Sequence, residues 1–173
     1  MRNVSLILVL GRYFEPIAGL LALMAANQDK GDRRQQGGVL IQKIVTAAAA
    51  ICGPVGNGLI RANYFELRDG QLHFVTHHGR GEAPRSQLPQ EALSLAMARK
   101  HALVPDVREV PNPASFAGVS YRTSLSSSVF SGETVHGLLT VDATGLGMLS
   151  KRDLRTAVAL SHMLGAGLAM QKK

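Results

Sequence analysis

Histidine is the residue of this chain with the widest chemistry, and three histidines crowd one short stretch. His73, His77 and His78 lie close together, whereas His101 and His136 lie elsewhere. A protein metal site needs converging histidines with carboxylate or thiolate ligands beside them. His73 and His77 are spaced to share one strand face, but no carboxylate accompanies them. We therefore expect a solvated strand and no metal site, and haem ligation by these rings has no support.

Hydroxyl side chains are the second group whose spacing is informative. Between Tyr121 and Phe130, alternation places Ser124, Ser126 and Ser128 on one strand face and apolar residues on the other. The next strand is expected to alternate too, with His136, Leu138, Thr140 and Asp142 opposite Val135, Leu139 and Val141. Buried hydroxyls are costly unless water or a ligand satisfies them. This face of the sheet therefore either lines a ligand pocket or is solvated. The alternation of residues is consistent with both alternatives.

Loops supply the remaining candidates, because loops on a rigid sheet carry binding residues disproportionately. Asp106 ends a short apolar stretch and faces a loop that contains Phe116 and leads to Tyr121. Asp106 fits equally a turn cap that bonds its own backbone. The predicted set of ligand-binding residues is Tyr64, His77, Asp106, Phe116, Tyr121, Ser124, Ser126, Ser128, His136 and Thr140.

Catalytic motifs are missing from the sequence. The single cysteine, Cys52, follows an expected helix and is typical of a small buried side chain. There is no nucleophile elbow and no phosphate loop of the Walker type. Gly79-Arg80-Gly81 together with Arg85 is only a weak signal for an anion site. We therefore expect no enzyme activity, no catalytic residue and no cofactor.

Composition limits the class of protein. A chain of 173 residues with 46% hydrophobic and 18% charged residues is long enough for one domain with a full core. Its formal net charge of +7 is dispersed in pairs such as Arg33-Arg34 and Lys172-Lys173. Nucleic-acid binders gather charge on one stripe and interleave aromatics with it. No nucleic-acid partner is therefore expected, and one cysteine excludes an internal disulfide.

The first 36 residues are expected to form a separate segment. Val4–Ala26 has two apolar runs broken by Arg12, Glu15 and Pro16, and Pro16 suits the first position of a helix. A membrane helix needs about 20 apolar residues, and each charge at its centre costs roughly 2 to 3.5 kcal/mol. The segment is therefore a marginal membrane anchor or a helix that packs against a second copy, and it fits a secretory signal poorly. Asn27–Gly38 is expected to be a polar linker.

Residues 37–173 are expected to form the main domain. The patterns predict a helix over 39–51, a hairpin over 59–78, a helix over 89–101, a strand over 102–107, a hairpin over 121–143 and a helix over 150–171. The first hairpin turns at Asp69-Gly70, and Ser150 with Asp153 forms a variant capping box. Antiparallel hairpins with helices before, between and after them indicate an α+β fold.

These segments resemble the GAF family of small-molecule sensor domains. The most specific piece is Thr134–Asp142, TVHGLLTVD, which looks like a strand of the family's penultimate hairpin. SKRDLRTAVALSHMLGAGL looks like the terminal helix, and Arg122–Val129, RTSLSSSV, resembles the preceding strand without the proline often found near Ser128. The resemblance implies an antiparallel sheet of five or six strands, with the first and last helices on one face and loops or short helices on the ligand-binding face. A single cysteine away from the pocket does not match the methionine sulfoxide reductase or bilin branches, and the cyclic-nucleotide pattern is not recognisable.

The resemblance implies a non-catalytic sensory or regulatory domain that binds a small molecule of unknown class. It would signal to a homodimer partner through its first and last helices. The alternative is a structural interaction or dimerisation module whose pocket is collapsed and filled by Phe74 or Phe116. A cavity above roughly 300 Å³ beside Ser124, Ser126 and Tyr121 would favour the sensor. The expected location is cytoplasmic, with or without membrane contact through residues 4–26, and the composition suits a bacterium.

Overall fold

The structure is a computed structural model of the 173-residue chain. It describes all residues except 1, 55–57, 82–83, 85–87, 113–115 and 173, and of residues 2–10 it describes the backbone alone. Arg85, a candidate for the anion site, therefore lies outside the described residues. The elements are α1 (Arg2–Ala26), α2 (Lys30–Ile51), β1 (Ile60–Arg68), β2 (Gln71–Gly79), α3 (Gln90–Met97), β3 (His101–Val104), β4 (Thr123–Ser131), β5 (Thr134–Ala143) and α4 (Lys151–Met170).

Helix α1 is continuous, so the expectation that Pro16 is the first residue of a helix is wrong. Pro16 lies inside the helix, where proline removes one backbone hydrogen bond and crowds the preceding turn. Pro16 is exposed, which lets water reach the freed carbonyl, while the next residue, Ile17, is 1% exposed in the core. Packing of the inner side of α1 thus outweighs the local preference of proline. Among the described residues, none of the helices combines the length and the apolar character needed to cross a membrane.

Helix α2 begins at Lys30, so most of the predicted linker Asn27–Gly38 is helical. Asp29 explains the early start, because its Oδ1 accepts the backbone N–H of Asp32 at 2.8 Å. Aspartate is among the strongest N-caps, and Asp32 adds a negative charge in the first turn, where the helix dipole favours it. The boundary expected between residues 36 and 37 therefore falls inside a helix.

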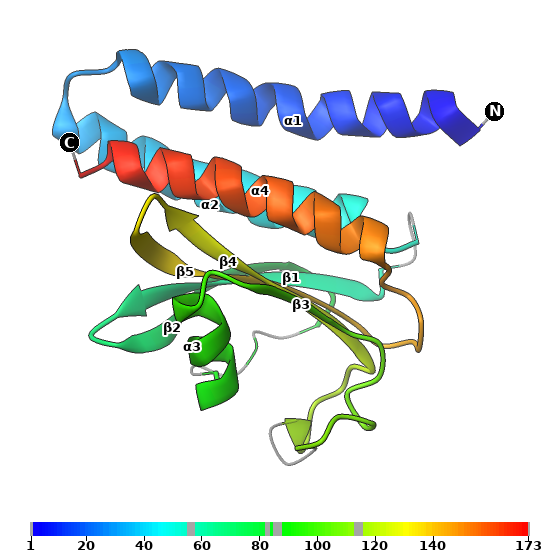
Figure 1. The fold of residues 1–173 in the computed structure, drawn as a ribbon. Coiled ribbons are helices and arrows are strands. Elements are labelled where there is room, and N and C mark those ends of the chain that lie inside the picture. The colour runs from blue at the N-terminus through cyan, green and yellow to red at the C-terminus, as the bar shows by residue number, and fades with distance from the viewer. Residues whose placement is uncertain (1, 55–57, 82–83, 85–87, 113–115, 173) are drawn as a thin grey trace.

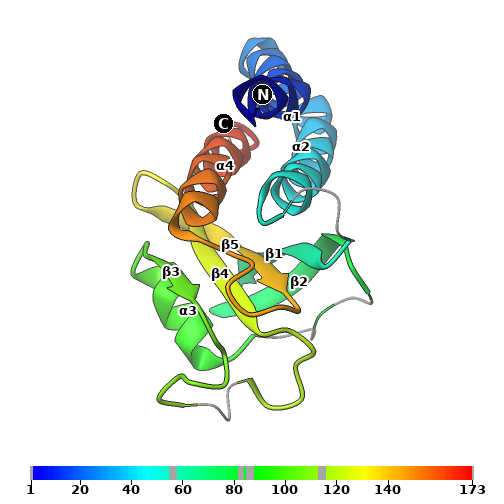
Figure 2. The same cartoon turned by 90° about the vertical axis from the view of Figure 1, so that its right-hand side faces the viewer.

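Five strands form one antiparallel sheet in the order β2-β1-β5-β4-β3. The β1–β2 hairpin turns at Asp69 and Gly70, whose φ angles of 50° and 73° suit the Asp-Gly pair. Helices α2 and α4 lie side by side on one face of the sheet, and α3 lies on the other (Figures 1 and 2). The predicted α+β class, with the helices that begin and end the main domain on one face, is confirmed.

Helix α1 adds an outer layer that the fold class does not predict. It lies over α2 and α4, on their side away from the sheet (Figures 1 and 2). Ile17 and Met24 are each 1% exposed and belong to the same core cluster as α2 and α4. The N-terminal segment is therefore packed on the body of its own chain.

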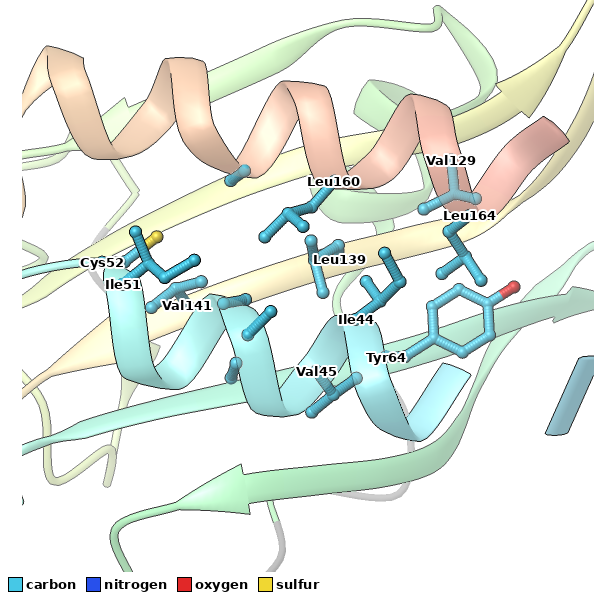
Figure 3. Close-up of a cluster of buried hydrophobic side chains, with 14 of the residues drawn as sticks. Ile44, Val45, Ile51, Cys52, Tyr64, Val129, Leu139, Val141, Leu160 and Leu164 are labelled. Atoms are coloured by element: carbon cyan, nitrogen blue, oxygen red, sulfur yellow. The ribbon is translucent and has the colours of Figure 1, made fainter. Parts of the chain in front are cut away.

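The main core lies between α2, α4 and the sheet (Figure 3). Ile44 from α2, Leu160 and Leu164 from α4, and Leu139 from β5 are fully buried there. A smaller cluster of Phe65, Leu72, Ala96 and Leu138 packs on the opposite face, beneath α3. These two clusters fix the sheet between its layers.

The predicted facing of the second hairpin is confirmed for most residues. Leu125, Val129, Leu139 and Val141 all belong to the core on the helix side. Val135 does not, because it packs with the cluster beneath α3. The pairing of β4 with β5 shifts register after Val129, so His136 has no partner residue in β4 and forms a bulge. As a result, Val135, which precedes the bulge, faces the opposite side from the one that simple alternation predicts.

The start of α4 is capped as predicted. The backbone N–H of Ser150 donates to Asp153 Oδ2 at 2.8 Å, and the reciprocal bond completes the capping box. The other carboxylate oxygen, Oδ1, accepts the N–H of Gly53 at 2.9 Å. One buried aspartate therefore ties the beginning of α4 to the segment that leaves α2.

Candidate ligand-binding cavity

A cavity of about 760 Å³ lies on the face of the sheet opposite α2 and α4. Strands β1, β4 and β5 form its floor, and α3 forms one wall. Ala102 and Val104 of β3 and described residues of the loops that follow β2 and β3 complete the lining. The cavity thus lies on the face where the hydroxyl side chains of β4 were expected.

Two rows of polar residues cross the floor, because neighbouring antiparallel strands hold them in register. Residues two positions apart on a strand return to the same face, so both rows point into the cavity. From β1 across β5 to β4, the first row is Asn63, Thr140 and Ser126, and the second is Arg61, Asp142 and Ser124. We call these six residues the polar floor.

Asp142 is the charged centre of the polar floor and is 3% exposed. Its Oδ2 accepts Arg61 Nε at 3.0 Å and Asn63 Nδ2 at 3.2 Å, and its Oδ1 accepts Arg80 Nη2 at 2.7 Å. Arg80 is also held by Ser120, whose Oγ accepts Nη1 at 3.2 Å. A buried carboxylate needs such charge-assisted donors. Asp142 therefore holds the guanidinium groups of Arg61 and Arg80 together at the floor of the cavity.

Two buried polar atoms of this cluster have no hydrogen-bond partner. Asn63 is 2% exposed, and its Nδ2 also donates to Thr140 Oγ1 at 3.0 Å, but its Oδ1 accepts no hydrogen bond. Arg80 Nε is a buried donor that is likewise unpaired. Most buried polar atoms in proteins are paired. Both atoms are enclosed by the side chains around them and are not exposed to the cavity.

The wall opposite the polar floor is apolar. Ala92 and Leu95 of α3 face the cavity three residues apart, as one side of a helix should. Leu88 and Phe116 add to the apolar lining, and Val104 of β3 adds an apolar side chain beside Ser124 on the sheet face. The cavity therefore combines a large apolar wall with a small group of fixed polar side chains, which is typical of small-molecule sites.

Five of the predicted site residues line the cavity: Phe116, Tyr121, Ser124, Ser126 and Thr140. The Phe116 and Tyr121 rings meet edge to face with their centroids 6.4 Å apart. Phe116 is part of the wall and does not fill the space. Binding by these five residues stays a prediction, but the structure brings them together.

Tyr64 is not a cavity residue, because β1 alternates and directs its neighbours Asn63 and Phe65 to the cavity face. Tyr64 lies in the core on the helix side, where its hydroxyl donates to the His136 carbonyl at 3.2 Å. Burial raises the pKa of the Tyr64 phenol. This side chain is a structural part of the core.

Ser128 and His136 are also absent from the cavity lining. Ser128 is fully buried beneath α3, and its Oγ donates to the Ala96 carbonyl at 2.9 Å. His136 occupies the extra position of β5, and its Nε2 pairs with Ser131 Oγ at 2.7 Å. Desolvation lowers the His136 pKa, as does nearby Lys172.

His77 lies against Phe74, with ring centroids 6.0 Å apart, and does not line the cavity. The pairing of β1 with β2 shifts register opposite Tyr64, which leaves Val75 as an extra residue of β2. That bulge places His73 and His77 on opposite faces, so the expected shared face is wrong. The described residues contain no group of three side chains suited to hold a metal ion.

Asp106 anchors a loop and does not line the cavity. Its Oδ1 accepts Arg122 Nε at 3.0 Å and the backbone N–H of Arg108 at 3.0 Å, and its Oδ2 pairs with Arg122 Nη2. The bonds from Arg122 and Arg108 lower the Asp106 pKa to about 2. The bond from the Arg108 N–H is the kind of backbone contact that the predicted turn cap would make. The ion pair with Arg122 was not predicted.

The prediction missed the most polar part of the site, which comprises Arg61, Asn63, Arg80 and Asp142. The alternation that places Thr140 on the cavity face also places Asp142 there. In β1, Arg61 and Asn63 alternate with buried apolar residues, and this pattern marks a polar inner face. Arg80 stood out only as part of a weak anion signal. None of these patterns shows that the four side chains meet, since that depends on strand pairing.

Comparison with known sequences finds no match, either to a protein-family model or to a curated protein. Solved structures do match. The chain is similar to free methionine-R-sulfoxide reductase from Neisseria meningitidis in complex with its substrate, with a TM-score of 0.65, 14% identity and coverage of 92% of this chain and 90% of that chain.

Two light-absorbing proteins are similar as well. The far-red absorbing dark state of JSC1_58120g3 with bound biliverdin IXa has a TM-score of 0.65 and 10% identity, covering 91% of this chain and 99% of that chain. The blue-light absorbing form of the Thermosynechococcus elongatus PixJ GAF domain has a TM-score of 0.62 and 11% identity, covering 81% and 88% of the two chains. The chain therefore has the GAF-like fold that its sequence resembles.

These structures correct one expectation. The prediction that the chain is not an enzyme is contradicted, because free methionine-R-sulfoxide reductases of three organisms share its fold. The GAF-like fold carries catalysis in some proteins and light absorption in others. In this chain the single cysteine, Cys52, is 1% exposed in the core on the helix side, and burial raises the pKa of its thiol to about 12.

Proposed function

We propose that this chain is a sensory or regulatory GAF-like domain that binds a small molecule above the polar floor. The observation that carries the proposal is the cavity of about 760 Å³, bounded by fixed polar groups and an apolar wall. Small-molecule sites generally measure about 300 to 1,000 Å³ and have this mixed lining. The light-absorbing proteins with the same fold support a sensory role.

The alternative of a collapsed, purely structural pocket has less support. Phe74, one of the two residues expected to fill the pocket, packs edge to face on Phe65 at a centroid distance of 5.8 Å. Phe116, the other, stands in the wall. Neither ring removes the space between α3 and the polar floor.

Native mass spectrometry of the purified full-length chain tests the proposal, together with the variant Ser126→Leu. Ser126 lines the cavity, so a leucine there occupies ligand space. We expect a small molecule to copurify with the wild-type chain and to be absent from Ser126→Leu. The matched control is Ser94→Leu, an exposed position of α3 that is not part of the cavity lining.

Thermal melting of the three proteins shows whether each variant folds. A wild-type chain without any bound molecule contradicts the proposal. A folded Ser126→Leu variant that keeps the same bound mass as Ser94→Leu contradicts it too, because the molecule would then lie elsewhere.

A further inference from the structure

We propose that the cavity takes an uncharged carbonyl compound, whose carbonyl oxygen lies between Ser126 and Thr140 and whose apolar body lies toward β3 and α3. This inference rests on the proposed function and names the chemical class that the same site selects. It is carried by the hydroxyl groups that are open to the cavity, by the bonds among the charged residues, and by the order of side chains across the sheet.

The hydroxyl groups of Ser124 and Ser126 are open to the cavity. Both residues line it, and no hydrogen bond joins either hydroxyl to another described residue. Neither oxygen is enclosed by its neighbours, in contrast to Asn63 Oδ1 and Arg80 Nε. A serine hydroxyl can donate one hydrogen bond and accept others. This capacity therefore serves whatever water or ligand occupies the cavity.

Thr140 has a hydroxyl whose hydrogen remains to be donated. Its Oγ1 accepts Asn63 Nδ2 at 3.0 Å, and among the described residues no acceptor takes the hydrogen of this hydroxyl. Thr140 pairs directly with Ser126 between β5 and β4, where the Cβ atoms of paired residues lie about 4.5–5.5 Å apart. A carbonyl oxygen has two lone pairs, so one such oxygen can accept a hydrogen bond from each hydroxyl. The two side chains together therefore suit the oxygen of a carbonyl group.

The charged residues of the described lining are bonded within the protein. Arg61 and Arg80 both donate to Asp142, which is 3% exposed. Glu91 is exposed on the first turn of α3, and its Oε1 accepts Asn112 Nδ2 at 2.8 Å. A charged ligand loses hydration when it enters a cavity, and this loss is offset only where an opposite charge is open to it. An uncharged ligand avoids that cost.

The sheet face becomes apolar toward β3, and this order sets the direction of the ligand. Ala102 pairs with Ser126 and Val104 pairs with Ser124 between β3 and β4, and all four residues line the cavity. An apolar body above Ala102 and Val104 removes both side chains from water and reaches the apolar wall that α3 forms. The carbonyl group then lies above β4 and β5.

Fluorescence titration of the full-length chain with three naphthalene probes tests the inference. The probes are the uncharged ketone prodan, an analogue with a methylene group in place of the carbonyl, and an analogue with a carboxylate in place of the propionyl group. We expect prodan to bind the wild-type chain more tightly than the carboxylate analogue does, because the carboxylate must give up more hydration.

Ser126→Ala removes one hydroxyl donor and breaks no hydrogen bond between described residues. It is expected to weaken binding of prodan about two- to tenfold, the usual effect of losing one hydrogen bond, and to leave binding of the methylene analogue unchanged. The emission of bound prodan should move to shorter wavelength, because its carbonyl loses a hydrogen-bond donor.

Thr140→Val keeps the shape of the side chain and is expected to have the same selective effect. Asn63 retains its bond to Asp142 Oδ2 in this variant. Ser94→Ala is the matched control, because Ser94 is exposed on α3 and does not line the cavity. Thermal melting shows whether each variant folds.

A carboxylate analogue that binds the wild-type chain as tightly as prodan overturns the uncharged class. Prodan binding that either folded variant leaves unchanged, or that falls together with binding of the methylene analogue, overturns the position of the carbonyl. Absence of prodan binding also overturns the inference. A wild-type chain that copurifies with no small molecule counts separately, against the proposed function itself.

Discussion

Two of the buried aspartates, Asp142 and Asp106, act at and beside the cavity in different ways. Asp142 lies at the floor of the cavity and holds two arginines in place. Asp106 lies at the end of the loop that follows β3 and joins it to Arg122, which directly precedes β4. The neighbour of Arg122 in sequence is the cavity residue Tyr121. The ion pair of Asp106 therefore fixes the chain next to Tyr121, while Asp106 itself does not line the cavity.

Asp106→Asn is predicted to lower the free energy of unfolding at pH 7, because it removes the ion pair with Arg122. The folded-state pKa of Asp106, about 2, lies below its ordinary value of 3.8. The stabilisation is therefore complete above about pH 4 and is lost as the pH falls towards 2. Urea unfolding of wild type and variant at pH 7, 4 and 2.5 should show a difference that shrinks at the lowest pH. A difference that stays constant down to pH 2.5 would contradict this role.

At the scale of elements, glycines decide how closely α4 approaches its neighbours. A Cβ at Gly165 would stand 2.2 Å from the Phe130 carbonyl oxygen of β4. A Cβ at Gly167 would stand 2.1 Å from Leu40 Cδ2 of α2. The Phe130 carbonyl is backbone and cannot turn aside, so α4 lies this close to β4 only with glycine at position 165, whereas at position 167 the end of the Leu40 side chain would have to move.

Gly165→Ala is predicted to lower the free energy of unfolding by about 1–3 kcal/mol, the usual cost of overpacking. Gly38→Ala is the matched control within helix α2, because its Cβ would meet no atom within 4 Å. It should raise stability by about 0.5–1 kcal/mol, since alanine loses less conformational freedom in a helix. Chemical denaturation of both variants measures the two changes, and equal effects would show that α4 does not lie this close to β4.

At the scale of the whole molecule, α1 changes which surface is available for partners. The expected homodimer would use the first and last helices of the main domain, α2 and α4. In this chain α1 lies over both of them (Figures 1 and 2). The outer side of α1 is exposed and includes Leu23, which is 62% accessible. A homodimer that forms through the helices would therefore contact the outer side of α1. Contact through α2 and α4 would require α1 to move away from them.

Ile17→Ala is predicted to lower the free energy of unfolding by about 2–5 kcal/mol, because it empties a buried site between α1 and the other helices. Leu23→Ala, on the exposed side of the same helix, should change it by less than about 0.5 kcal/mol. Urea unfolding combined with light scattering measures stability and oligomeric state together. The reverse order of effects would mean that the outer side of α1 is the one that packs, against a second copy or another surface.

Much of the fold follows from local patterns of the sequence. The Asp69-Gly70 pair determines the first hairpin, the Ser150–Asp153 box begins the last helix, and alternation assigns Leu125, Leu139 and Val141 to the core. These features depend on residues close together in the chain, whose preferences act before any tertiary contact forms. For this reason the α+β class and the position of Ser124, Ser126 and Thr140 on the cavity face were predictable.

The remaining features depend on tertiary structure. The bulges at Val75 and His136 reverse the facing of nearby residues, and a bulge is set by pairing between strands and not by either strand alone. Packing on α2 and α4 keeps α1 helical through Pro16. The cluster of Arg61, Arg80 and Asp142 forms because β1 pairs with β5, 81 residues further along the chain at the Arg61–Asp142 contact. Strand pairing over such a distance brings together charges that no local pattern connects, and it thereby decides the chemistry of the cavity.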